Sequence, residues 1–115
     1  MKTERWKEFF VRYDGNPILK PSMWPYSVGA VFNPGAVKFN NEVLLLVRVE
    51  DRRGYSHLSI ARSKDGRTDW RIDPKPALEA AVTFNEAIFG LEDPRIVWLE
   101  DHRARDSRRS WCVAL

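Results

Sequence analysis

Residues 42–49 read Glu-Val-Leu-Leu-Leu-Val-Arg-Val and form the strongest β-strand pattern of the chain. The five consecutive apolar residues 43–47 are typical of a strand that is buried on both faces. Residues 40–41 (Asn-Asn) predict a tight turn before this strand, because asparagine tolerates a positive φ. Residues 51–54 (Asp-Arg-Arg-Gly) predict a second turn after it. The segment is therefore expected to be connected to a neighbouring strand on each side.

Shorter strand patterns lie on both sides of this segment. Residues 37–39 lead into the Asn-Asn turn, and residues 56–62 (Ser-His-Leu-Ser-Ile-Ala-Arg) alternate polar and apolar with a period of two. Residues 63–66 (Ser-Lys-Asp-Gly) predict another turn, and residues 70–72 predict a short outer strand. Four strands joined by tight turns form a meander, which is the unit of a β-propeller blade.

A second unit of the same kind is expected to begin near the end of the chain. Residues 95–99 and 111–115 predict two strands that are separated by a highly charged turn. Residues 1–12 fit either a short amphipathic helix or an edge strand. We therefore expect an all-β fold that holds the first blade and the start of a second blade, which is an incomplete propeller. The expected division is an N-terminal segment and loop at 1–29, a four-stranded blade at 30–75, a connection at 76–92 and a truncated second blade at 93–115.

Composition excludes several classes of protein. Hydrophobic residues make up 43% of the 115 residues, and five Trp and six Phe favour a folded chain over a disordered one. The net charge of +3 is too small to predict nucleic-acid binding, although it is compatible with an anionic ligand such as phosphate. Cys112 is the only cysteine, so no internal disulfide can form. Without an apolar leader or membrane span, the chain is expected to be cytoplasmic with no membrane partner.

Two polar motifs each precede a run of strand-forming residues. They are residues 31–35 (Val-Phe-Asn-Pro-Gly) and residues 90–95 (Gly-Leu-Glu-Asp-Pro-Arg). Asp93 fits either a turn that opens a strand or an acid that faces a ligand, and turn chemistry alone favours the turn. Asn33 fits either a plain turn or an amide held toward a ligand, because the following proline restricts it to an extended conformation.

Arginine positions supply two further candidates. Arg48 follows five apolar residues, so its guanidinium needs an anionic or hydroxyl-rich partner. That partner is either a carboxylate of Glu50 or Asp51, or a sugar. Arg62 lies near a strand end and is a weaker candidate for the ligand site.

Several residue types that often mark a site are expected to be structural here. Trp24 and Tyr26 could stack on a sugar ring, but they are more often core or blade-packing residues. His57 is expected to be structural rather than catalytic. The two His and one Cys have no metal-ligand spacing, so no metal site is expected.

Five motifs occur in one order over residues 14–99. They are Asn16-Pro17-Ile18-Leu19, Val31-Phe32-Asn33-Pro34-Gly35-Ala36-Val37, Leu46-Val47-Arg48-Val49-Glu50-Asp51-Arg52, Ala61-Arg62-Ser63-Lys64-Asp65-Gly66 and Gly90-Leu91-Glu92-Asp93-Pro94-Arg95. Together they resemble the N-terminal part of the β-1,4-mannoside phosphorylase family, glycoside hydrolase family 130. The combination is specific, although no single motif is.

The resemblance implies a five-bladed β-propeller with its active site in a central funnel. Members of the family use inorganic phosphate to split β-1,4-mannosidic bonds with inversion, which gives mannose 1-phosphate. The resemblance implies that Asp93 is the acid and that Asn33 and Arg48 contact the sugar. Family members are much longer than this chain, so we expect a fragment that lacks most of the phosphate-binding residues and is inactive alone. The charged turn at 101–109 is longer and more basic than the family's hairpin.

The chemistry of inverting cleavage explains the residue types. The reaction needs an acid at the leaving oxygen and a nucleophile on the opposite face of the sugar ring. Phosphate is already an anionic nucleophile, so phosphorolysis needs one carboxylic acid and no cofactor. Hydrolysis needs a second carboxylate, for which Glu50, Asp51 and Glu92 are candidates. The expected partners are a β-mannoside oligosaccharide and phosphate, without nucleic acid; a homo-oligomer, a β-mannoside hydrolase and a non-catalytic carbohydrate-binding module stay open as alternatives.

Overall fold

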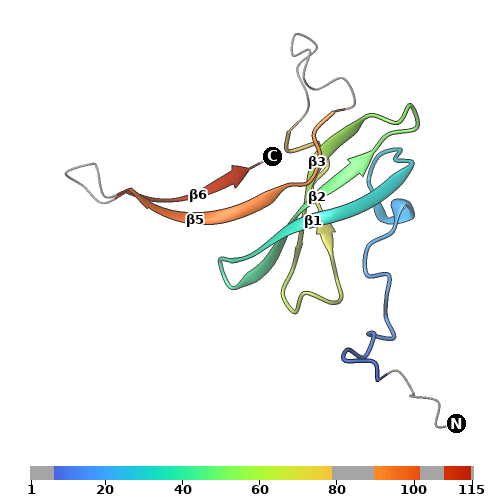
Figure 1. The fold of residues 1–115 in the computed structure, drawn as a ribbon. Helices are drawn as coiled ribbons and strands as arrows, with labels where there is room; N and C mark the ends of the chain where they lie inside the picture. Colours follow the sequence, from blue (N-terminus) through green and yellow to red (C-terminus); the bar gives the residue numbers. More distant parts are fainter. Residues whose placement is uncertain (1–6, 79–89, 102–107, 115) are drawn as a thin grey trace, which may run out of the picture.

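The computed structural model describes residues 7–78, 90–101 and 108–114. An antiparallel sheet of four strands in the order β1-β2-β3-β4 forms the body of the molecule (Figure 1). Its strands are β1 (Ala30–Phe39), β2 (Glu42–Glu50), β3 (Ser56–Ser63) and β4 (Arg71–Ile72). The predicted meander is confirmed.

A second, two-stranded sheet follows. It consists of β5 (Arg95–Asp101) paired antiparallel with β6 (Arg108–Ala114). The described part of the chain also has the short 3₁₀-helix η1 (Pro21–Met23) and no α-helix. The all-β prediction is therefore confirmed, and neither described sheet closes on itself. The number of blades stays a prediction.

The turn between β1 and β2 forms as the sequence predicts. Asn40 and Asn41 have φ values of +50° and +59°, the left-handed conformation that asparagine tolerates. Gly54 has a φ of +89° in the turn between β2 and β3. These short turns bring consecutive strands into antiparallel pairing.

β1 is longer than the predicted strand at residues 37–39, because it begins at Ala30 and contains the Asn-Pro pair. Val31 pairs with Val49, whereas Pro34 pairs with Val47, so one extra residue on β1 makes a bulge. β1 is an edge strand, where a proline that cannot donate to the ladder is tolerated. Residues that look like turn signals in the sequence therefore lie within a strand.

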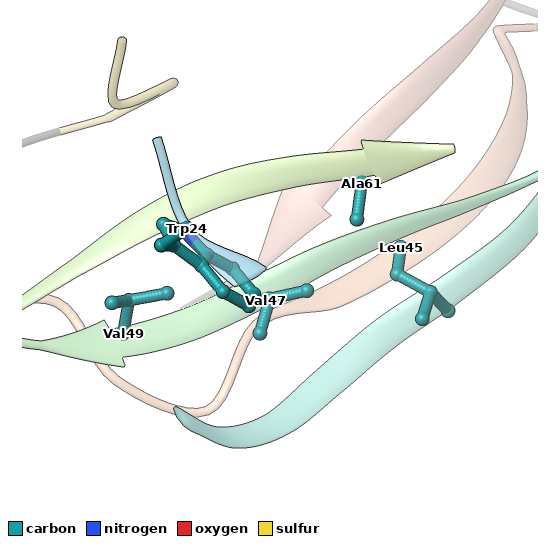
Figure 2. Close-up of a cluster of buried hydrophobic side chains, with 5 residues drawn as sticks. All are labelled: Trp24, Leu45, Val47, Val49 and Ala61. Atoms are coloured by element: carbon teal, nitrogen blue, oxygen red, sulfur yellow. The ribbon is translucent and has the colours of Figure 1, made fainter. Parts of the chain in front are cut away.

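A small hydrophobic core covers one face of the four-stranded sheet (Figure 2). Its buried side chains are Trp24, Leu45, Val47, Val49 and Ala61. Trp24 belongs to the segment before β1, and its indole N–H donates to the buried Ser59 hydroxyl at 3.1 Å. Trp24 is therefore a core residue, as predicted, and it fixes the N-terminal segment to this face.

The opposite face carries Leu46, Arg48 and Leu58, because alternate residues of a strand point to opposite sides. Leu46 and Leu58 are buried. The start of β5 crosses this part of the molecule, where a Cβ at Gly35 would lie 3.2 Å from the Ile96 side chain. The face opposite the Trp24 core is thus the one that meets the second sheet.

The remaining segments bear on the other predictions. Residues 7–12 form neither the helix nor the edge strand that the sequence left open. The middle of the predicted connection (79–89) and most of the charged turn (102–107) lie outside the described residues.

Candidate functional site

Two close glycine contacts hold residues 90–94 against the four-stranded sheet. Gly90 has a φ of +95°, and a Cβ there would lie 1.9 Å from the Ser56 carbonyl oxygen. A Cβ at Gly35 would lie 2.9 Å from the Pro94 carbonyl oxygen. Only glycine lets two backbones approach this closely. The two acidic residues between these contacts are therefore held beside the sheet.

Arg48 joins the sheet to this segment. Its Nη2 lies 2.7 Å from Glu92 Oε1, and its Nε donates to the Ser56 hydroxyl at 3.1 Å. Its Cζ lies 4.5 Å from the centroid of the Phe32 ring, which is the geometry of a cation–π contact. Glu50 Oε2 is more distant, at 3.9 Å from Nη2. The sequence predicted Glu50 or Asp51 as the carboxylate partner of Arg48, and the structure corrects this. Glu92 is the carboxylate within hydrogen-bond distance, Glu50 is more distant, and Asp51 pairs with Arg53 instead.

Asp93 and Asn33 flank this contact in the sequence. Asp93 follows Glu92 and is exposed, with a φ of +48°. Positive φ is uncommon outside glycine, and such residues concentrate at functional sites as well as in turns. Asn33 follows Phe32 and is exposed at the bulge of β1. The structure therefore brings together the segments of Asn33, Arg48 and Asp93, and the role of each residue stays a prediction.

Arg62 is not part of this group. Its guanidinium pairs with the carboxylate of Asp73. Leu58 is the partner of Arg48 in the β2–β3 ladder, and Arg62 lies four residues further along β3. That separation is about 13 Å along a strand. The structure thus places Arg62 away from the Arg48 contact.

His57 is a buried residue of the core face. Its Nε2 lies 2.7 Å from the Tyr26 hydroxyl oxygen, and the two ring centroids are 5.5 Å apart. It alternates with its neighbours in β3, so it points away from the Arg48 face. This placement agrees with the structural role expected for His57.

The carboxylate of Asp51 is occupied in the turn after β2. It accepts hydrogen bonds from the Arg53 guanidinium at 2.7 Å and from the backbone N–H groups of Arg53 and Tyr55 at 2.8 and 3.2 Å. The bond from the Arg53 side chain is the main reason why the pKa of Asp51 lies below its ordinary value. Of the three candidate second carboxylates, Asp51 is therefore the one committed to turn structure.

Sequence reasoning missed Phe32 and Ser56 in the group around Arg48, and it named Glu92 only as a candidate second carboxylate, not as a partner of Arg48. Ser56 had a usable signal, because a hairpin closed by residues 51–55 pairs Glu50 with Ser56 and makes Ser56 a diagonal neighbour of Arg48. Glu92 is 44 residues from Arg48, and no local pattern indicates their contact.

Two absences concern the described residues only. Within residues 7–78, 90–101 and 108–114, no three His, Cys, Asp or Glu side chains are grouped in a way that could hold a metal ion. No helix in this part of the chain has the length and hydropathy of a membrane span.

Comparison with known proteins finds similarity both in sequence and in structure. The chain is 30% identical to a β-1,2-mannobiose phosphorylase from Listeria innocua, over 78% of its own length and 41% of that protein. It is similar in sequence to a mannoside phosphorylase. No family model matches the chain.

The fold has a counterpart in a solved structure. The crystal structure of a protein from Parabacteroides distasonis, provisionally described as a glycoside hydrolase, matches with a TM-score of 0.60 and 25% identity. The match covers 90% of this chain and 38% of the other. The chain thus spans about two fifths of the length of the relatives that it matches.

These matches support the motif resemblance at the level of mannoside phosphorylases and related glycoside hydrolases. They do not support the finer prediction of a β-1,4 linkage, because the phosphorylase relative is described as acting on β-1,2-mannobiose. The linkage stays a prediction.

Proposed function

We propose that this chain supplies the acid and part of the sugar-binding surface of an inverting glycoside phosphorylase that acts on β-mannosides. The products are mannose 1-phosphate and the shortened sugar. The observation that carries the proposal is the 2.7 Å contact between Arg48 and Glu92, which joins two motifs that are 44 residues apart in the sequence. The similarity to a mannobiose phosphorylase supports the choice of substrate class.

The residues divide the chemistry as follows. Asp93 is the acid, and its proton reaches the leaving oxygen by way of a sugar hydroxyl as the bond from that oxygen to the sugar C1 breaks. A phosphate oxygen forms the new bond to C1 from the opposite face, which inverts the configuration. Asn33 and Arg48 donate hydrogen bonds to sugar hydroxyls. Their segments meet beside the acid, so the reacting sugar is held where the proton is delivered.

Hydrolysis is the second candidate, because Glu50 and Glu92 both lie near Arg48 and the structural neighbour is described as a glycoside hydrolase. In that version one of these carboxylates activates a water molecule in place of phosphate. Dependence on phosphate separates the two candidates.

Binding is the first test. The ¹⁵N-labelled chain is titrated with β-1,2- and β-1,4-mannobiose, with and without phosphate, and the amide signals are followed by NMR. We expect saturable shifts at Asn33, Arg48 and Asp93. Arg48→Ala should weaken binding about tenfold or more, the cost of losing hydrogen bonds from a charged group. Arg52→Ala is the matched control, because it removes an exposed guanidinium from the neighbouring turn.

Turnover is the second test. We expect no mannose 1-phosphate from the 115-residue chain alone, because the chain spans two fifths of its phosphorylase relative. Phosphate-dependent formation of mannose 1-phosphate would contradict that inactivity and support phosphorolysis. Release of free mannose without phosphate would favour hydrolysis. If neither mannobiose binds, the proposed function is wrong.

A further inference from the structure

The guanidinium of Arg48 is held on three sides. The Phe32 ring lies against one face at 4.5 Å, the Ser56 hydroxyl accepts from Nε at 3.1 Å, and Glu92 accepts from Nη2 at 2.7 Å. Among the described residues, none accepts a hydrogen bond from Nη1. Two of the three nitrogens are thus occupied, and the third keeps its donors.

Burial makes these contacts necessary. The Arg48 side chain is only 18% exposed, so its charge has lost most of its water and needs fixed partners. Its planar guanidinium can satisfy acceptors on two edges at once without changing its orientation. Glu92 is 44% exposed and reaches Arg48 from the segment between the two sheets. The partner that fixes Nη2 is therefore the residue directly before Asp93.

We infer that Glu92 is a positioning residue for Arg48. Together with Ser56 it sets the plane of the guanidinium so that Nη1 is the donor that meets the ligand hydroxyl. This inference rests on the proposed function, because it assigns Nη1 to the sugar. Glu92 also joins the position of Arg48 to that of Asp93, since a shift of the 90–94 segment moves both.

A simpler role for Glu92 is charge balance alone. Glu50 provides a matched comparison, because its carboxylate also faces Arg48 but at 3.9 Å, beyond a hydrogen bond. Removing either carboxylate deletes one negative charge beside the same guanidinium. Only the removal of Glu92 also deletes a hydrogen bond.

The test follows the Arg48 Nε–H signal by ¹H–¹⁵N NMR, assigned by its absence in Arg48→Lys. In the unchanged chain we expect a slowly exchanging, shifted signal, because Nε donates to Ser56. Glu92→Ala should loosen the guanidinium, move this signal toward the position of a free arginine and raise its hydrogen exchange rate about tenfold. Glu92→Gln keeps an acceptor of the same length and should preserve most of the shift. Glu50→Gln should leave the signal unchanged.

Mannobiose affinity is measured in the same variants. We expect Glu92→Ala to weaken binding about tenfold, Glu92→Gln about threefold, and Glu50→Gln less than twofold. Partial rescue by glutamine supports positioning, because it restores geometry without charge. Equal losses in Glu92→Gln and Glu50→Gln would show that charge alone matters and would overturn the inference.

The two proposals can fail separately. An Nε–H signal that Glu92→Ala does not change would overturn the positioning role, whatever the sugar does. A signal that changes as expected in a chain that binds neither mannobiose would overturn the proposed function and the assignment of Nη1 to a sugar, while the Glu92 contact would stand.

Discussion

Asp65 organises the turn between β3 and β4. Its carboxylate accepts the Thr68 hydroxyl at 2.6 Å and the backbone N–H groups of Arg67 and Thr68 at 2.8 Å each. The Ser63 hydroxyl oxygen lies 2.9 Å from the same carboxylate. These donors, the Thr68 hydroxyl first, hold the pKa of Asp65 far below its ordinary value. One ionised side chain therefore connects Ser63, Arg67 and Thr68 across this turn.

Because of this turn, the free energy of unfolding of the chain should decrease as the pH is lowered below about 5. A carboxylate with a lowered pKa in the folded state stabilises that state above its unfolded pKa of about 4, and the contribution falls as the pH drops below this value. The folded pKa of Asp65 is so low that the loss should continue to the lowest accessible pH. We expect the urea midpoint to fall between about pH 5 and pH 2, and Asp65→Asn to flatten this fall.

Asp14→Asn is the matched control for the acid dependence, because the Asp14 side chain is exposed and makes no hydrogen bond or ion pair with the described residues. It should leave the slope unchanged. Asp51 has a pKa lowered in the same direction, so some slope should remain in Asp65→Asn. A slope that Asp65→Asn leaves at its full value would contradict the role given to Asp65.

Residue type and position were enough to predict part of the candidate site. A guanidinium after five apolar residues indicates that Arg48 needs a partner, and Trp24 in an aromatic-rich chain indicates a core residue. The identity of the Arg48 partner depends on how a distant segment packs, and a local pattern contains no information about that. The sequence indicates Glu92 only as a candidate second carboxylate.

At the element scale, the segment between the two sheets depends on glycine. Gly90 and Gly54 have similar positive φ values of +95° and +89°. Their surroundings differ, because a Cβ at Gly90 would lie 1.9 Å from Ser56 backbone, whereas the nearest atom to a Cβ at Gly54 is 3.9 Å away. Substitution of Gly54 therefore measures the cost of the positive φ alone, whereas substitution of Gly90 adds a steric clash with the Ser56 backbone.

Alanine substitution at both positions tests this difference. Gly54→Ala should lower the free energy of unfolding by about 1–2 kcal/mol, the cost of a left-handed conformation. Gly90→Ala should add to that cost or displace residues 90–94, and it should also change the Nε–H signal of Arg48. Chemical denaturation and NMR measure the two effects. Equal losses of stability with an unchanged Arg48 signal would contradict the close contact.

Strand patterns predicted some elements better than others. β2 and β3 follow from apolar content and period-two alternation, and both lie near their expected positions. The first half of β1 was missed, because Asn33-Pro34-Gly35 has the composition of a turn. An edge strand with a bulge accommodates those residues, and only the pairing with β2 shows it.

The molecule as a whole is elongated rather than compact. Its radius of gyration is 17.9 Å, whereas a compact chain of this length is expected at about 13 Å. The β5–β6 hairpin reaches out from the four-stranded sheet (Figure 1). Val97, Trp98 and Val113 of this hairpin are each more than two fifths exposed. The two sheets therefore differ in how much packing supports them.

Hydrogen exchange should reveal this difference. We expect amides of β2 and β3 to exchange most slowly, because these strands pair on both edges and carry the core. Amides of β5 and β6 should exchange faster, because a two-stranded sheet is marginally stable in water. Mass spectrometry of peptides after timed exchange measures both. Equal protection of the two sheets would show that they unfold as one cooperative unit.

The sequence predicted the order of elements in the molecule but not how the two sheets meet. The four-stranded meander and the β5–β6 hairpin follow from local strand patterns and from the turn residues between them. The junction depends on close contacts at Gly35 and Gly90, which a single sequence does not distinguish from ordinary turn glycines. Five blades, which the family resemblance implies, remain a prediction.

The contact between Arg48 and Glu92 has a consequence for ligand binding. Arg48 belongs to the four-stranded sheet, and Glu92 belongs to the segment that leads into the β5–β6 hairpin. A ligand bound at this contact would therefore touch both the sheet and that segment. Ligand binding and the packing of the hairpin against the sheet would then stabilise each other. A bound ligand would slow the separation of the β5–β6 hairpin from the four-stranded sheet. A substitution far along β5 or β6 that weakens the packing of the hairpin would lower the affinity for the sugar without contacting it.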